Sequence, residues 1–211
     1  ALTTDSMLLR LIPLLPLAGA ILNIVLGKCV NRKTAGILAC LTVAISFLLS
    51  LHGFSVLPHG RALQDNVFVW IESGPFRADV ALQVDALSAI MLLVITGIGF
   101  LIHVYSLGYM GHDEGAVRYF AYLNLFIFFM VLLVMADNLL LLFVGWEGVG
   151  LCSFLLIGFW YQDPANTIAG NKAFIVNRIG DFGFMLGLLL LFWEISSQGI
   201  PSLSFAALER N

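Results

Sequence analysis

Hydrophobic residues form six long runs along the chain, separated by shorter polar segments. The runs cover about residues 7–27, 34–57, 85–107, 119–135, 139–160 and 171–194. A helix rises 1.5 Å per residue, so about 20 apolar residues cross the hydrocarbon core of a bilayer, which is about 30 Å thick. The pattern therefore predicts an all-α integral membrane protein with about six transmembrane helices.

The polar segment between the second and third runs predicts a β-hairpin. Residues 67–72 read VFVWIE and residues 76–84 read FRADVALQV, with Ser73-Gly74-Pro75 between them. Alternation of β-branched and polar residues around a turn is typical of two paired strands, and an irregular loop is the alternative. Because isolated hairpins are only marginally stable, we expect this one to dock on a partner surface.

The runs suggest three parts and an orientation. Residues 1–84 would hold two helices and the hairpin, residues 85–194 the start of a helix bundle, and residues 195–211 a connecting segment. The loop KCVNRK at 28–33 is the one compact basic loop. The positive-inside rule places it in the cytoplasm, or in the matrix of a mitochondrion, and places the hairpin on the outer side.

Composition supports a membrane location. Of 211 residues, 60% are hydrophobic and 11% are charged, and the mean hydropathy is +0.99, whereas soluble domains carry about 25% charged residues. No basic patch indicates nucleic acid as a partner, and no phosphate loop or cysteine cluster indicates a cofactor in this chain. The cysteines Cys29, Cys40 and Cys152 match neither a disulfide nor a metal pattern. The first run lacks a cleavage site, so we expect it to be retained.

Glu147 is the one ionisable residue in the run LLLLFVGWEGVGLCSFLLIGFW at 139–160. A carboxylate at that depth costs about 2.5–3.5 kcal/mol on insertion scales, so it must be protonated or paired. Gly145, Gly148 and Cys152 recur on one helix face, which predicts close packing there and places Glu147 in another sector. A carboxyl group that gains and loses a proton suits proton transfer, and a purely structural glutamate is the alternative.

The sixth run carries a second set of polar residues. Arg178 and Asp181 are three residues apart, so a helix places them on one face, where they can pair, and Asn177 can join them. Lys172 lies nearer the membrane surface. It is either a fourth member of a proton-conducting set or an interfacial anchor that extends toward the headgroups.

Depth places these residues near Glu147. Counted at 1.5 Å per residue from the loop between the two runs, Glu147 lies roughly 20 Å deep, Asp181 about 15 Å and Arg178 about 10 Å. We expect that loop to cover residues 161–170, with Asp163-Pro164 as a helix-start signal. If the fifth and sixth helices touch, the charges share one layer, and movement of the cation can switch the carboxyl group. A static ion pair that locks the two helices together is the alternative.

His103, Tyr105 and Tyr109 lie near the end of the third run. Aromatic residues at such positions usually form the interfacial belt of a membrane protein. His103 could feed a proton path, but a histidine whose hydrogen bonds are satisfied inside the bundle is the favoured interpretation.

Three segments together resemble a known family. They are VDALSAIMLLVITGIGFLIHVYSLGYM at 84–110, the stretch from RYFAYLNLF to GWEGVGLCSFLLIGFW at 118–160, and KAFIVNRIGDFGFMLG at 172–187. They closely resemble the chain 5 or subunit L family of the proton-pumping NADH:quinone oxidoreductase, respiratory complex I. The combination of GWEGVGLCS with NRIGDFG is very specific. The large subunits of cation/proton antiporters share much of this pattern and are the nearest competitor.

The resemblance implies an antiporter-like subunit of the membrane arm, which translocates protons while electrons pass from NADH to quinone elsewhere. The family's key protonatable glutamate falls on Glu147, and its modulating arginine and aspartate fall on Arg178 and Asp181. NADH, FMN, iron–sulfur clusters and quinone are then expected on other subunits. The implied partners are the other subunits of the complex, especially neighbouring antiporter-like subunits, together with lipid and protons.

The chain also departs from the family pattern. Family members are several hundred residues longer and carry a lysine on a broken seventh helix, a second inverted set of helices and a long lateral helix. The 211 residues match the N-terminal third, and Lys172 should not be taken for the missing lysine. The resemblance implies the bacterial cytoplasmic membrane, with the mitochondrial inner membrane as the alternative. A Na⁺/H⁺ antiporter subunit and a structural scaffold remain as alternative functions.

Overall fold

The computed structural model describes residues 4–27, 29–57, 62–74, 76–197 and 202–208, with side chains from residue 7 onward. Its elements are α1 (Thr4–Leu26), α2 (Arg32–Val56), β1 (Leu63–Ser73), β2 (Phe76–Val84), α3 (Ala86–Tyr109), α4 (Ala116–Met135), α5 (Leu139–Ile157), α6 (Pro164–Ser197) and α7 (Phe205–Leu208). The helices α1 to α6 are each long and apolar enough to cross a membrane. The predicted fold class, six spans and one hairpin, is confirmed.

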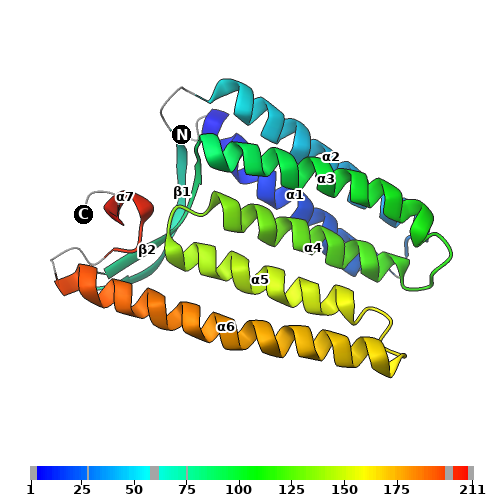
Figure 1. Ribbon diagram of the computed structural model, residues 1–211. Coiled ribbons are helices and arrows are strands. Elements are labelled where there is room, and N and C mark those ends of the chain that lie inside the picture. Colours follow the sequence, from blue (N-terminus) through cyan, green and yellow to red (C-terminus); the bar gives the residue numbers. More distant parts are fainter. Residues whose placement is uncertain (1–3, 28, 58–61, 75, 198–201, 209–211) are drawn as a thin grey trace.

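The six long helices run side by side, and the connections between them gather at two ends (Figure 1). We call one the basic end, because Arg32, Lys33 and Arg118 lie there, and the other the hairpin end. The helices α1 to α4 form the packed part of the bundle, α5 packs on α4, and α6 contacts α5 at the edge. Most of the surface of α6 is consequently open.

Polar side chains cap several helix starts. Asp85 and Ser88 form a capping box at α3, and the Asn138 carboxamide accepts a hydrogen bond from the Leu141 N–H of α5 at 2.9 Å. The one large shift from expectation is at α6, which begins at Pro164 rather than near residue 171. Asp163 accepts a hydrogen bond from the Ala165 N–H at 2.9 Å, and proline at the first helical position is preorganised for a helix. The expected loop 161–170 is therefore wrong in its second half.

The hairpin is antiparallel, and its first strand begins four residues earlier than expected. A side-chain hydrogen bond joins Gln64 to Gln83 at 2.8 Å, and Arg10 of α1 forms an ion pair with Asp65 at 2.5 Å. These contacts extend the pairing toward the bundle. Gly74 in the turn has φ of 57°, a conformation that favours glycine, and Pro75 of the predicted turn lies outside the described residues.

The link between α4 and α5 joins the hairpin edge. The Asp137 N–H donates to the Ala81 carbonyl at 3.1 Å, and the Asp137 carbonyl accepts from the Phe205 N–H at 3.0 Å. The Leu139 N–H donates to the Leu203 carbonyl at 3.1 Å. The link therefore lies between β2 and the segment that follows α6, a pairing that no pattern in the sequence predicts.

Proline in α1 is accommodated by a neighbouring helix. Pro16 has no N–H, so the carbonyl of Ile12, four residues earlier, lacks its normal helical partner. The buried Ser46 hydroxyl of α2 donates a hydrogen bond to that carbonyl at 2.7 Å. A neighbour thus satisfies the freed carbonyl, as tolerance of proline within a span requires.

Candidate functional site

Small residues on α5 bring it close to α4. A Cβ at Gly145 would lie 2.7 Å from the Leu133 backbone, and one at Gly148 would lie 2.1 Å from the Phe129 ring. Cys152, on the same face, is fully buried. The expected close-packed face is therefore present, and Glu147 lies in the sector of α5 that faces α6.

One guanidinium group joins the two helices. The Arg178 Nη1 of α6 forms an ion pair with the Glu147 carboxylate of α5 and lies 3.6 Å from the Asp181 carboxylate. The expected pairing of Arg178 with Asp181 is present, and the three side chains share one layer of the bundle. A single cation thus contacts two carboxylates within the membrane-spanning part of the chain.

Aromatic rings border this charged cluster. The Arg178 guanidinium lies over the Phe174 ring, 4.5 Å from its centroid, and its Nε is buried without a hydrogen-bond partner among the described residues. Cations are attracted to the face of an aromatic ring. The ring therefore restricts the position of Arg178 without neutralising its charge.

Trp146 is a member of the site that the sequence did not identify. Its Nε1–H donates a hydrogen bond to the Asp181 carboxylate at 2.7 Å, and its ring stacks on Phe184. The available signal was the indole itself, because an indole N–H inside a membrane span, away from water, needs a hydrogen-bond partner. This bond fixes Asp181, which is buried, from the α5 side.

The cluster differs from a fully enclosed ion pair in its exposure. The side chains of Arg178, Glu147 and Asp181 retain 35%, 26% and 8% of their accessible surface in this chain. Asp181 is therefore held inside the α5–α6 contact, whereas Glu147 and Arg178 reach its open side. Glu147 is accessible to a proton carrier from that side.

Lys172 and Asn177 lie outside the cluster. Both are exposed, and within the described ranges Lys172 has no carboxylate within 4.0 Å and Asn177 no side-chain hydrogen bond. Lys172 precedes Arg178 by six residues, or about 9 Å along the helix. The proton-transfer role of Lys172 stays a prediction.

His103 belongs to a different polar group, inside α1–α4. The ring is fully buried; Nδ1 lies 2.8 Å from the Gly99 carbonyl and Nε2 lies 2.9 Å from the Asn124 carboxamide. The Asn124 carboxamide also donates to the Thr42 hydroxyl at 3.4 Å. His103 is thus satisfied inside the bundle, which is the favoured interpretation of the sequence.

Nothing in the described ranges groups three or more His, Cys, Asp or Glu side chains in a way that could hold a metal ion. The α5–α6 site itself presents two carboxylates, a guanidinium and an indole. The expectation that redox cofactors are bound by other chains stays a prediction.

Comparisons with known proteins agree with the resemblance. Residues 70–120 match the family profile described as NADH-ubiquinone oxidoreductase (complex I), chain 5 N-terminus. Residues 136–211 match the profile described as NADH:quinone oxidoreductase/Mrp antiporter, TM. The first match contains much of the hairpin and α3, and the second contains the whole α5–α6 site.

Similar proteins bear the name NADH-quinone oxidoreductase subunit L. That of Rickettsia bellii is 44% identical over 188 residues, which cover 89% of this chain and 29% of the relative. That of Mycobacterium tuberculosis (strain H37Rv) is 44% identical over 206 residues, 92% of this chain and 32% of the relative. That of Neisseria meningitidis serogroup A is 44% identical over 193 residues, which cover 89% of this chain and 28% of the relative. The chain spans less than a third of the length of these relatives.

Proposed function

Because this chain belongs to the chain 5 or subunit L family of antiporter-like NADH-quinone oxidoreductase membrane subunits, we propose that it translocates protons within such a complex. The electrons pass from NADH to quinone on other subunits, which carry FMN and the iron–sulfur clusters. The neighbours of this chain are other membrane subunits of antiporter-like type. The relatives named above are bacterial, which supports the bacterial cytoplasmic membrane as the location.

The observation that carries this proposal is the sharing of Arg178 between Glu147 and Asp181. When Glu147 is ionised, Arg178 pairs with it. When Glu147 binds a proton, it becomes a neutral carboxylic acid and its attraction for the guanidinium falls. Arg178 then moves toward Asp181, which Trp146 holds in place. Return of Arg178 favours ionised Glu147 and releases the proton.

The geometry offers Arg178 two carboxylate partners, Glu147 and Asp181. A carboxylate within the membrane is costly when it is unpaired, and a cation that leaves one carboxylate must find another. Asp181 provides that second partner three residues along α6. Lys172 lies toward the basic end of the same helix and is proposed as the group that exchanges protons with that surface.

A second candidate is a subunit of a Na⁺/H⁺ antiporter, which one observation favours. The profile that matches residues 136–211 also describes Mrp antiporters. In that case the same Glu147 and Arg178 would serve ion exchange without electron transfer. Dependence of proton movement on NADH oxidation separates the two candidates.

The test replaces Glu147 by Gln in the complete complex. We expect proton translocation per assembled complex to fall by roughly a hundredfold, since positioned acid–base groups contribute about 10²–10⁴-fold to proton transfer. Proton uptake into inverted membrane vesicles, driven by NADH, gives the measurement. The matched control is Glu72→Gln, which changes an exposed carboxylate at the end of β1.

Abundance of the complex separates transport from scaffolding. If Glu147→Gln lowers the amount of complex but leaves proton translocation per complex unchanged, the residue is structural and the transport proposal is wrong. Normal abundance with impaired translocation supports it. A defect in Na⁺-driven proton movement without any NADH dependence supports the antiporter instead.

A further inference from the structure

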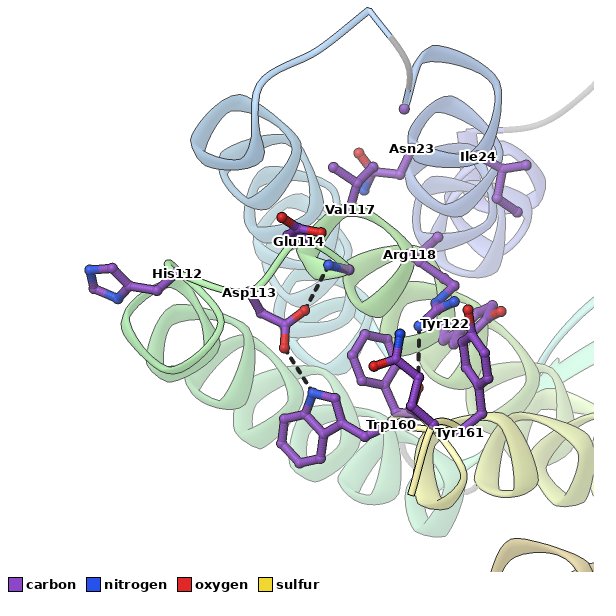
Figure 2. Close-up of a pocket in the computed structure, with 15 residues that line it drawn as sticks. Asn23, Ile24, His112, Asp113, Glu114, Val117, Arg118, Tyr122, Trp160 and Tyr161 are labelled. Carbon is purple, nitrogen blue, oxygen red and sulfur yellow. Dashed lines mark hydrogen bonds between the residues drawn. The ribbon is translucent and has the colours of Figure 1, made fainter. Parts of the chain in front are cut away.

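A cavity of about 940 Å³ opens at the basic end, away from the α5–α6 site. It lies between the end of α1, the start of α4 and the α5–α6 connection, and Figure 2 shows the side chains that line it. Its walls belong to the last turns of membrane spans, where lipid headgroups meet water. Its size is within the range of about 300–1,000 Å³ that is usual for small-ligand pockets.

Arg118 presents its positive charge to this cavity. Its Nη2 donates a hydrogen bond to the Phe159 carbonyl at 3.2 Å, and its Nε is buried without a partner in the described part of the chain. The guanidinium lies over the rings of Phe159 and Tyr161, at 4.7 and 5.1 Å from their centroids. Among the described residues, no carboxylate lies within 4.0 Å of it, although its charge acts on Asp113 from a greater distance. Because no carboxylate pairs with it directly, the guanidinium can bind an anionic group of a ligand.

One further donor lines the same cavity. Asn23 of α1 is 3% exposed and lines the cavity, and its Nδ2 has no hydrogen-bond partner in the part of the chain described. The start of α4 also lines the cavity, but its Gly115 N–H already donates to the Asp113 carboxylate at 2.6 Å and the Ala116 N–H donates to the Asp113 carbonyl at 3.3 Å. Arg118 and Asn23 together therefore form the wall that can bind phosphate.

The facing wall is acidic. Figure 2 shows Asp113 and Glu114 on one side and Arg118 with Tyr161 on the other. Hydrogen bonds from the Trp160 Nε1–H at 2.8 Å and the Gly115 N–H at 2.6 Å hold the pKa of Asp113 below its usual value. Asp113 is therefore ionised at neutral pH. Arg118 and Arg32 both act on the charge of Asp113, so charges of both signs lie around the cavity and favour a ligand that carries both an anionic and a cationic group.

We propose that this cavity binds the headgroup of a zwitterionic, amine-bearing phospholipid of the phosphatidylethanolamine class. The phosphate diester contacts Arg118 and Asn23, and the ammonium group contacts the side of Glu114 and Asp113. The ring of Trp160 borders the ammonium group, and aromatic faces attract such cations. The site does not depend on proton transport by Glu147, which lies deep in α5.

The test uses the complete complex in vesicles that contain a phosphatidylethanolamine with a photoactivatable headgroup. After illumination, we expect mass spectrometry to find the label on peptides that contain residues 113–122 or 159–162. Arg118→Gln should reduce this labelling by about tenfold, since charge-assisted hydrogen bonds to phosphate are among the strong ones. Unlabelled phosphatidylethanolamine should compete, whereas phosphatidylglycerol and free inorganic phosphate should compete at least about tenfold less well.

Two variants make the test decisive. Glu114→Gln changes an exposed side chain, so the fold should survive, and the preference for phosphatidylethanolamine over phosphatidylglycerol should fall to near equality. Lys33→Gln, at the basic end but outside this cavity, should leave labelling unchanged, as should Glu147→Gln. Equal competition by phosphatidylglycerol with Glu114 present, or unchanged labelling in Arg118→Gln, would overturn the proposal. Competition by inorganic phosphate alone would identify a phosphate site rather than a lipid site.

Discussion

Two polar regions lie inside the bundle, and they differ in charge and in enclosure. The group of His103, Asn124 and Thr42 lies within α1–α4, and each of its members is 8% exposed or less. The group of Glu147, Arg178 and Asp181 lies at the α5–α6 contact and carries three charges on a partly open side. The first has one arrangement of partners, whereas the second has a cation with two.

The difference explains which region can move. The Gly99 carbonyl and the Asn124 Oδ1 are both acceptors, so His103 Nδ1 or Nε2 donates where it bonds either of them. A hydrogen-bonded network in a close-packed interior has no second arrangement of comparable energy. At the α5–α6 contact, Arg178 has two carboxylate partners within one layer, and the proposed switch uses both. The proposed switch therefore lies at the edge of the bundle, outside the packed α1–α4 part.

The largest effect is expected from filling the close contact between α4 and α5, which lies between the two polar groups. Gly145→Leu places side-chain atoms where the Leu133 backbone lies, since even a Cβ would be 2.7 Å from it. The cost should exceed the about 1–3 kcal/mol that is typical of overpacking, because backbone cannot move aside. We expect the complex to be absent from native gels. Gly187→Leu on α6, where a Cβ meets nothing within 4 Å, should assemble; assembly of both would contradict the close α4–α5 contact.

The second-largest effect should come from removing the positive charge of Arg178. Arg178→Met leaves Glu147 and Asp181 without their shared partner, so both carboxyl groups are favoured in the neutral form. We expect NADH-driven proton uptake per complex to fall by roughly a hundredfold. Arg178→Lys keeps the charge and should recover part of the activity. Equal activity of the Met and Lys variants would show that the charge of Arg178 is not used.

A smaller effect, on stability rather than on proton uptake, is expected in the group of His103, Asn124 and Thr42. His103→Phe leaves the Asn124 carboxamide without its partner, which typically costs about 1–3 kcal/mol. The amount of complex and its thermal midpoint should fall, while proton uptake per assembled complex stays normal. Tyr105→Phe, on the exposed side of the same helix, serves as the control. A loss of proton uptake per complex in His103→Phe would break the comparison, because the enclosed region would then take part in transport.

The smallest effect concerns two carboxylates at the hairpin end, outside the spans. Burial and repulsion by Asp79 raise the pKa of Asp137, whereas hydrogen bonds from Arg77 and Asn66 lower the pKa of Asp79. A raised carboxyl pKa destabilises the folded state once the pH exceeds the unfolded value, near 3.8. Asp137→Asn should therefore raise the thermal midpoint at pH 7 by roughly 1–3 °C, and the gain should vanish as the pH falls below that value.

Asp79→Asn provides the opposite case. A lowered pKa stabilises the folded state above the unfolded value and loses that contribution as the pH falls through the folded value. The variant should therefore lower the midpoint at pH 7 and approach the unmodified chain in acid. Midpoints that move in the same direction in both variants would contradict the assignment of one paired and one repelled carboxylate.

The helices and the hairpin followed from the sequence because each depends on local pattern. The 3.6-residue repeat placed Gly145 and Gly148 on one face and Glu147 on another, and that separation decides what each side of α5 contacts. The spacing of Arg178 and Asp181 predicted their pairing for the same reason. Helix depth counted from a loop was sufficient to place the charges in one layer, even though that loop ends earlier than expected.

Contacts between distant segments did not follow from the sequence. Trp146 reaches Asp181 across a helix contact, and an aromatic residue in an apolar run gives no sign of which polar group it will meet. The pairing of Asp137 with Ala81 and Phe205 uses backbone groups alone, so no side-chain pattern marks it. The helix α6 starts at Pro164 because Asp163 caps it. The sequence contains this start signal, but we expected the helix to begin near residue 171.

The hydrogen bond from Ser46 to the Ile12 carbonyl restricts how the first two helices can shift. If α1 slid by one turn along α2, it would leave a bare carbonyl in hydrocarbon, at a cost of several kcal/mol. That single hydroxyl therefore favours one register of the two helices over a shift by a turn.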